Sequence, residues 1–80
     1  MKTVQIRYFA SLREQVGLQR EQLETAAVTV GELYDELRHR YDFSLAQDAV
    51  KVAINEEYRS MEYVLTGGEE VVFIPPVSGG

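Results

Sequence analysis

Hydrophobic and polar residues alternate at the start of the chain. Within residues 2–9, one face of the predicted strand carries Val4, Ile6 and Tyr8. The other face carries Gln5, Arg7 and Phe9. A period of two residues is typical of a β-strand that buries one face. The pattern therefore predicts a first strand over 2–9, with its apolar side toward a core.

Later segments carry shorter or weaker versions of this pattern. Residues 50–55 alternate, and a turn over 55–57 leads to a short strand that begins near Tyr58. Residues 66–69, TGGE, predict a tight turn, because glycine accepts a positive φ without steric cost; a last strand follows over 70–74. Residues 20–28 are mostly polar, with Leu23 and Val28 as inward positions, which is typical of an edge strand.

A short helix is predicted after the first strand. Ser11 stands three residues before Glu14, which is the spacing of an N-terminal capping box. Gly17 is placed to end the helix in a left-handed conformation. We therefore expect a helix of under two turns that is stable only when docked.

A longer helix follows, with a fuller start signal. Thr29 is the predicted N-cap, Glu32 completes the capping box, and Val28 is expected to pack against Leu33 as a hydrophobic staple. The apolar stripe of this helix consists of Val30, Leu33, Tyr34, Leu37 and Tyr41. Such a stripe indicates a helix that covers one face of a sheet.

The predicted order of elements is β-α-β-α-β-β-β. It predicts the α+β fold class: a roll in which a mixed sheet has one long helix packed on one face. A length of 80 residues supports one domain. We assign residues 1–76 to this domain and residues 77–80 to a flexible C-terminal tail.

Composition excludes several classes of function. The absence of cysteine rules out disulfides, thiolate nucleophiles and zinc-ribbon sites, and it is typical of cytoplasmic proteins. No apolar run approaches the roughly 20 residues of a membrane span, and the N-terminus lacks the layout of a signal peptide. A net charge of −5 disfavours nucleic acid and favours a partner with a basic surface. We expect a cytoplasmic protein that binds neither nucleic acid nor membranes.

The titratable side chains predict neither an acid–base site nor a metal site. His39, the only histidine, lies between Arg38 and Arg40 in the last turn of the long helix, where cations favour the negative end of the helix dipole. We expect it to cap the helix or face solvent. The acidic residues of the C-terminal part are predicted to form a solvated face: Glu56, Glu57, Glu62, Glu69 and Glu70.

The chain ends in PPVSGG. Pro75 and Pro76 remove backbone donors and hold the chain extended, so the four residues after them reach about 13 Å beyond the sheet. Bare glycines at the tip suit a narrow partner channel and close approach to a nucleotide. The carboxylate of Gly80 is ionised and unreactive at neutral pH. Adenylation by ATP would make its carbonyl carbon electrophilic, and a sulfur or amine nucleophile would then leave a thiocarboxylate or an amide.

Four segments together resemble the small, sulfur-carrying subunit of molybdopterin synthase, the MoaD family. They are Tyr8-Phe9-Ala10 with Arg13-Glu14, Val52-Ala53-Ile54-Asn55, Leu65-Thr66-Gly67-Gly68-Glu69-Glu70-Val71 and Phe73-Ile74-Pro75-Pro76-Val77-Ser78-Gly79-Gly80. The resemblance runs nearly end to end, and PPVSGG is its specific part, because Gly-Gly alone is shared by ubiquitin and every related carrier. It implies the ubiquitin-like β-grasp fold. Gly68 and Glu69 stand where the family more commonly has Asp-Glu after a single glycine, which concerns only turn geometry.

The resemblance implies that this chain supplies sulfur and holds no metal or permanently bound cofactor. A MoeB-type enzyme consumes ATP to adenylate Gly80, and a sulfur donor, a desulfurase or a rhodanese-like protein, converts Gly80 to a thiocarboxylate. The tail residues Val77, Ser78 and Gly79 then thread into the large subunit, MoaE, where sulfur passes to cyclic pyranopterin monophosphate to build molybdopterin. Two sulfurs per pterin imply a heterotetramer. The carrier is thus a non-catalytic subunit of a sulfurtransferase.

The partner interface is predicted on the side of the sheet that points away from the long helix. Phe9 lies there if its neighbours in the first strand face the core, and the alternation places Ala53 beside it. Tyr58 and Ile74 are expected to join this apolar patch, with Pro75 and Pro76 at the root of the tail. Phe9 could instead curl over the short helix. Arg13 could pair with a partner's carboxylate, with Glu14 or with solvent.

Other functions stay compatible with these residues. A carrier for thiazole formation or tRNA thiolation, resembling ThiS, would use the same carboxylate chemistry, although such proteins lack the PPV segment. A ubiquitin-like modifier joined to lysines would need Gly-Gly equally. A binding module would keep its function without Gly79 and Gly80.

Overall fold

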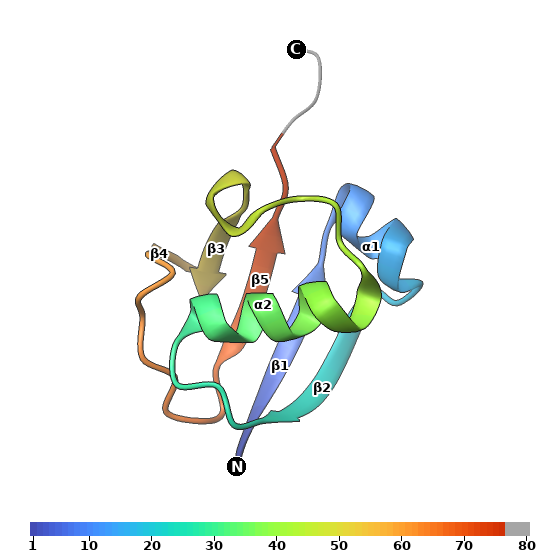
Figure 1. Cartoon of the computed structure of the whole chain (residues 1–80). Coiled ribbons are helices and arrows are strands. Elements are labelled where there is room, and N and C mark those ends of the chain that lie inside the picture. The colour runs from blue at the N-terminus through green and yellow to red at the C-terminus, as the bar shows by residue number, and fades with distance from the viewer. Residues whose placement is uncertain (77–80) are drawn as a thin grey trace.

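The computed structural model describes residues 1–76. These residues form one mixed sheet of five strands in the order β2-β1-β5-β3-β4 (Figure 1). The elements in chain order are β1 (Lys2–Tyr8), α1 (Ala10–Val16), β2 (Arg20–Thr25), α2 (Val30–Tyr41), the single 3₁₀ turn η1 (Gln47–Ala49), β3 (Lys51–Ile54), β4 (Glu57–Arg59) and β5 (Glu70–Ile74). The predicted α+β class and order of elements are confirmed.

The sheet is built around a parallel pair. β1 and β5 run parallel at its centre, whereas β1–β2, β3–β5 and β3–β4 are antiparallel. Figure 1 shows α2 crossing one face of the sheet and α1 lying at the end where β1 finishes. None of the described helices is long and apolar enough to cross a membrane.

The hydrophobic core lies between the sheet and α2. The predicted inward residues of β1, namely Val4, Ile6 and Tyr8, are fully buried. The α2 stripe meets them with Val30, Leu33, Tyr34 and Leu37, which are also fully buried. Both periodicities thus predicted the buried faces correctly.

The start of α2 follows its capping signal. The backbone N–H of Glu32 donates to Thr29 Oγ1 at 3.2 Å, and the Glu32 carboxylate accepts from the backbone N–H of Val28 at 3.1 Å. Val28 itself is not an inward residue, because half of its surface is exposed. β2 ends at Thr25, which is buried, and Ala27, two residues later, is buried as well. The alternation therefore places Val28 outside, which corrects the sequence prediction.

The start of α1 differs from its prediction. Ser11 does not cap the helix, since α1 begins at Ala10 and its N-cap is Phe9, without a side-chain hydrogen bond. The carbonyl of Phe9 accepts from the backbone N–H of Leu12 at 3.1 Å. The first turn therefore closes directly on the end of β1. Gly17 ends α1 in the left-handed region, with φ of 84°, as predicted.

Candidate functional site

Three strands bring their ends together where the tail leaves the sheet. β1 and β5 are parallel, with Tyr8 opposite Phe73, so both strands finish at the same edge. β3 runs the other way and starts there, with Lys51 opposite Ile74. Figure 1 shows this edge at the end of the sheet opposite the N-terminus. The predicted tail residues Val77, Ser78, Gly79 and Gly80 lie outside the described residues.

The sheet face that points away from α2, called the open face below, carries a row of residues in register across all five strands. The row runs Arg20, Arg7, Val72, Ala53, Tyr58 from β2 to β4. Residues in register share one side of the sheet. Two residues further along the chain, toward the root of the tail, Phe9 follows Arg7 just past the end of β1, and Ile74 follows Val72 in β5.

The predicted interface residues lie on or beside this open face. Phe9 is 37% exposed and Tyr58 is 75% exposed, and Ile74 is half-buried. The Phe9 ring lies beneath the Arg7 guanidinium carbon at 5.5 Å, which places it with the open face and outside the core. Pro75 is buried and Pro76 exposed at the end of β5.

One predicted neighbour lies elsewhere. Ala53 is in the row of Arg7, with Val72 of β5 between the two. It therefore does not sit beside Phe9. Alternation fixes the face on which a residue lies, but the order and register of the strands decide its neighbours.

Arg7 is the residue of the open face that sequence reasoning passed over. It is half-buried, and its Nε is buried without a hydrogen-bond partner in residues 1–76. The sequence signal was available: Arg7 stands two residues before Phe9, whose backbone continues the extended conformation past the end of β1, and this spacing lets a guanidinium lie over a ring.

Arg13 is exposed on α1 and forms no ion pair with a carboxylate of residues 1–76. The ion pairs within the described part of the chain are Arg40–Glu36 at 3.7 Å and Arg59–Glu57 at 2.6 Å. Both are surface pairs, which contribute little to stability. The pairing of Arg13 with Glu14, one of the alternatives from the sequence, is thus absent from this part of the structure.

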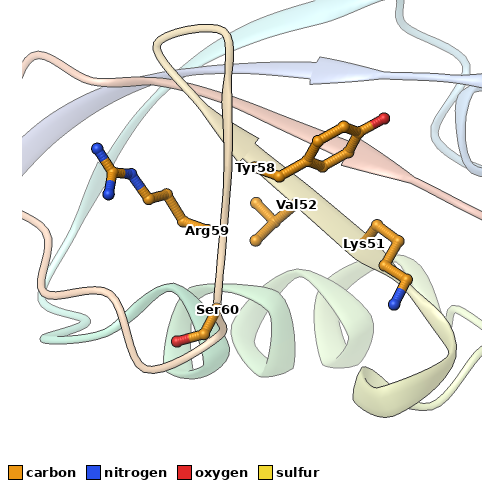
Figure 2. A pocket seen from close by; sticks show the side chains of 5 residues that line it. All are labelled: Lys51, Val52, Tyr58, Arg59 and Ser60. Carbon is orange, nitrogen blue, oxygen red and sulfur yellow. The ribbon is translucent and has the colours of Figure 1, made fainter.

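A hollow of about 510 Å³ opens at the β3–β4 edge, lined by Lys51, Val52, Tyr58, Arg59 and Ser60. Figure 2 shows the Lys51 and Arg59 side chains on opposite sides of it, pointing away from each other. Arg59 is already paired with Glu57 and lies over the Tyr63 ring at 5.8 Å. The two cations therefore do not converge on a common ligand position.

Glu69 does not belong to the solvated acidic face, because it is 3% exposed. Its carboxylate accepts from the backbone N–H and the hydroxyl of Thr66 at 2.7 and 2.9 Å, and from the backbone N–H of Gly67 at 2.7 Å. Burial by itself raises the pKa of Glu69, but these hydrogen bonds outweigh it and hold the pKa below its ordinary value. Glu69 is therefore a turn-forming residue, which corrects the sequence prediction.

The remaining titratable groups of residues 1–76 form no metal site: no three of the His, Cys, Asp and Glu side chains there are grouped to hold an ion. His39 is exposed in the last turn of α2, as expected. The open face and the root of the tail carry the exposed apolar side chains Phe9 and Tyr58, and they are the candidate site.

Comparison with known proteins decides the family. A model of the ThiS family matches residues 6–80 of the chain. The chain belongs to the ThiS family.

Relatives of this ThiS-family chain include two named molybdopterin synthase sulfur carrier subunits. The one from Haemophilus influenzae is 33% identical over 91% of this chain and 94% of its own length. The one from Mycobacterium tuberculosis is 36% identical, with both chains covered completely. The predicted family resemblance is therefore confirmed.

The fold also has close counterparts among solved structures. SAMP1 from Haloferax volcanii superposes with a TM-score of 0.79, at 27% identity over 98% of this chain and 99% of that one. The ubiquitin-like β-grasp fold that the resemblance implied is confirmed.

Proposed function

We propose that this chain is the sulfur carrier subunit of molybdopterin synthase and acts in molybdenum cofactor biosynthesis. The observation that carries the proposal is the full-length match to subunits of that name, which covers both chains completely in the Mycobacterium tuberculosis case and so includes the PPVSGG segment. The chain supplies sulfur as a non-catalytic subunit. It works in the cytoplasm and holds no cofactor of its own.

The reacting group of the proposed carrier is the carboxylate of Gly80. An oxygen of this carboxylate attacks the α-phosphorus of ATP in a MoeB-type activating enzyme, and pyrophosphate leaves. A thiol reductant releases sulfide from the persulfide of a desulfurase or rhodanese-like donor; the sulfide then attacks the carbonyl carbon, and AMP leaves. The resulting thiocarboxylate bonds through its sulfur to cyclic pyranopterin monophosphate, and water then cleaves the acyl–sulfur bond, which leaves the sulfur on the pterin and restores the Gly80 carboxylate. Because the pterin takes up two sulfurs, two carriers serve each round of synthesis.

The partner in this proposal is the large subunit, MoaE, bound through the open face. Phe9, Tyr58 and Ile74 offer apolar contact area there, and Arg13, Pro75 and Pro76 lie at the end from which the tail departs. A partly apolar face on a chain with a net charge of −5 suits a partner whose surface is otherwise basic. Docking of this face would direct Val77, Ser78 and Gly79 into the active site of the large subunit.

Mass measurement after activation tests the proposal. The chain is incubated with ATP, a MoeB-type enzyme and sulfide. The masses of the intact protein and of its C-terminal fragment are then measured by mass spectrometry. We expect replacement of one oxygen by sulfur, localised to Gly80 and dependent on ATP. Oxidation of Met1 or Met61 adds nearly the same mass, so localisation is essential. A chain that lacks Gly79 and Gly80 is the control and should show no shift.

Failure of the shift with a competent activating enzyme would contradict the carrier chemistry. A shift without sulfur transfer to the pterin in the presence of the large subunit would instead favour a ThiS-like carrier for another acceptor. The two steps therefore separate the activation of Gly80 from the identity of the acceptor.

A ubiquitin-like modifier is the second candidate, and the likeness to SAMP1, a small archaeal modifier protein, favours it. The same adenylated Gly80 would then be attacked by a lysine amine, and AMP would leave as an isopeptide bond forms. Peptides that carry the C-terminal remnant of this chain on lysine, found by mass spectrometry of cell extract, would support the modifier. Their absence from cells that make molybdopterin would exclude it.

A further inference from the structure

We propose that Arg7 selects the partner of the open face by pairing with a carboxylate of the large subunit. The inference rests on the proposed function, since it concerns the interface that the carrier would use. It adds the chemistry that the partner must present opposite Arg7 within that interface: an acidic side chain.

Arg7 is the second of the five residues in the row and lies next to its central residue, Val72. Arg20 and β2 lie on one side of it, and Val72, Ala53 and Tyr58 lie on the other. Val72 points away from α2 and yet is only 7% exposed. A partner that covers this row would bury the Arg7 side chain with it, since buried interface centres exclude water.

The side chain of Arg7 is already held in place. Its guanidinium carbon lies 5.5 Å from the centre of the Phe9 ring, so the charged group is directed along β1 toward the root of the tail. Stacking on a ring reduces the rotamer freedom that a flexible cation would lose on binding. Arg7 is therefore oriented before the partner arrives.

The hydrogen-bonding capacity of Arg7 is unused within residues 1–76. Its Nε is buried without a partner, and no carboxylate of these residues forms an ion pair with it. A guanidinium presents parallel N–H groups that match the two oxygens of a carboxylate. A partner carboxylate that pairs with the terminal N–H groups would therefore neutralise the charge, whereas a partner without one would leave a charge buried and unpaired.

The partner carboxylate that Arg7 requires acts at short range. Its sign is opposite to that of the partner surface that the net charge of the chain attracts. A net charge of −5 attracts partners that are basic overall, but Arg7 requires one acidic side chain of the partner within the interface. The two demands together discriminate among partners more sharply than either alone. The pairing should act on dissociation rather than on association, because steering depends on net charge and the short-range pair forms only after contact.

Kinetic binding of the full chain to the purified large subunit of molybdopterin synthase tests the inference. Arg7→Leu keeps an apolar stem and removes the guanidinium. We expect it to raise the dissociation rate constant at least about tenfold and to change the association rate constant less than about threefold. Arg7→Lys keeps the charge without the paired N–H groups, and its dissociation rate constant should lie between those of the wild type and Arg7→Leu. Arg40→Leu is the matched control: Arg40 is an exposed residue in the last turn of α2, away from the open face, so the variant changes net charge equally and should alter affinity less than about threefold.

The stability of the free chain provides an independent readout. Arg7→Leu should leave the melting temperature unchanged or raise it, because it removes a buried donor without a partner. Weaker binding therefore cannot be ascribed to unfolding. Charge-neutralising variants of each acidic residue on the large subunit, combined with Arg7→Leu, should reveal one position whose effect is strongly non-additive.

Each outcome decides something. If Arg7→Leu binds as tightly as the wild type, or loses no more affinity than Arg40→Leu, the inference is wrong while the proposed function stands. Additivity of Arg7→Leu with every acidic variant of the partner overturns it equally. If the wild-type chain does not bind the large subunit, the proposed function itself fails and this inference fails with it.

Discussion

The hydroxyl of Tyr8 donates a 2.8 Å hydrogen bond to the carboxylate of Glu21. Tyr41, at the end of α2, donates to both oxygens of the same carboxylate at 2.8 and 2.9 Å. Glu21 thereby ties the central strand, the edge strand and the long helix together. Tyr8 is fully buried, so Glu21 supplies the hydrogen-bond partner that a buried phenol needs. Tyr8 directly precedes Phe9 in the chain, so this junction anchors the backbone beside the open face.

Raising the pH should reveal the contribution of Tyr8 in this junction to the stability of the fold. Burial, and then the hydrogen bond to Glu21, raise the pKa of Tyr8 far above its ordinary 10.0. The stabilising effect is complete below pH about 10 and is lost as pH rises through the folded-state pKa, since the unfolded phenol releases its proton first. We expect Tyr8→Phe to cost about 0.5–1.5 kcal/mol at pH 7 and to lose stability less steeply above pH about 10 than the wild type.

Urea unfolding at a series of pH values measures this difference. Tyr58→Phe, at a position that is 75% exposed, is the matched control and should follow the wild type throughout. Parallel stability curves for Tyr8→Phe and the wild type above pH about 10 would contradict the prediction.

Phe9→Ala should separate binding from stability. The side chain is 37% exposed and lies outside the core, so we expect the free energy of unfolding to fall by less than about 1 kcal/mol. Affinity for the large subunit should fall about 10- to 100-fold, because partly exposed aromatics at interface centres contribute most of the binding energy. Calorimetric titration measures this, and Val28→Ala, an exposed apolar residue beside α2, should bind as the wild type does. Equal affinities for the two variants would place the interface elsewhere.

Glu69→Gln should destabilise the turn before β5 by about 1–3 kcal/mol at pH 7, because an amide cannot accept from both Thr66 and Gly67 as the carboxylate does. The pKa of Glu69 lies below its ordinary 4.5. Its stabilising effect is therefore present above pH about 4.5 and is lost as pH falls through the folded-state pKa. The gap between wild type and variant should narrow in acid. Thermal unfolding from pH 7 to pH 3 tests this, with exposed Glu62→Gln as control; a gap that widens in acid would refute it.

The β3–β4 hairpin carries removable strain. Asn55 and Glu56 form its two-residue turn and both have positive φ, 50° and 73°. Such turns favour Asn followed by Gly, because an L side chain is strained in the left-handed region. We expect Glu56→Gly to stabilise the fold by about 0.5–1 kcal/mol, whereas Glu57→Gly, in β4, should destabilise it. Chemical denaturation compares the two; a loss of stability in Glu56→Gly would show that the turn tolerates glutamate without strain.

The sequence by itself determined which segments form helices and strands. It also determined the buried face of those with the clearest hydrophobic periodicity. The alternation in β1 and the stripe in α2 reflect the geometry of strand and helix, which depends on neighbours along the chain, so both were readable. Phe43 was not: it is buried with 3% exposure in a segment without a period, stacked on Tyr34 at 5.8 Å. Its burial depends on α2 and on residues far along the chain.

Only the tertiary structure decided the neighbours across the sheet. The parallel pairing of β1 with β5 places Val72 between Arg7 and Ala53, and no local pattern encodes that order. The same pairing leaves Arg7 with a buried donor and no partner in residues 1–76. The periodicity of one strand specifies which face a residue occupies, whereas contact between strands depends on register and order, which arise only when distant segments pack together.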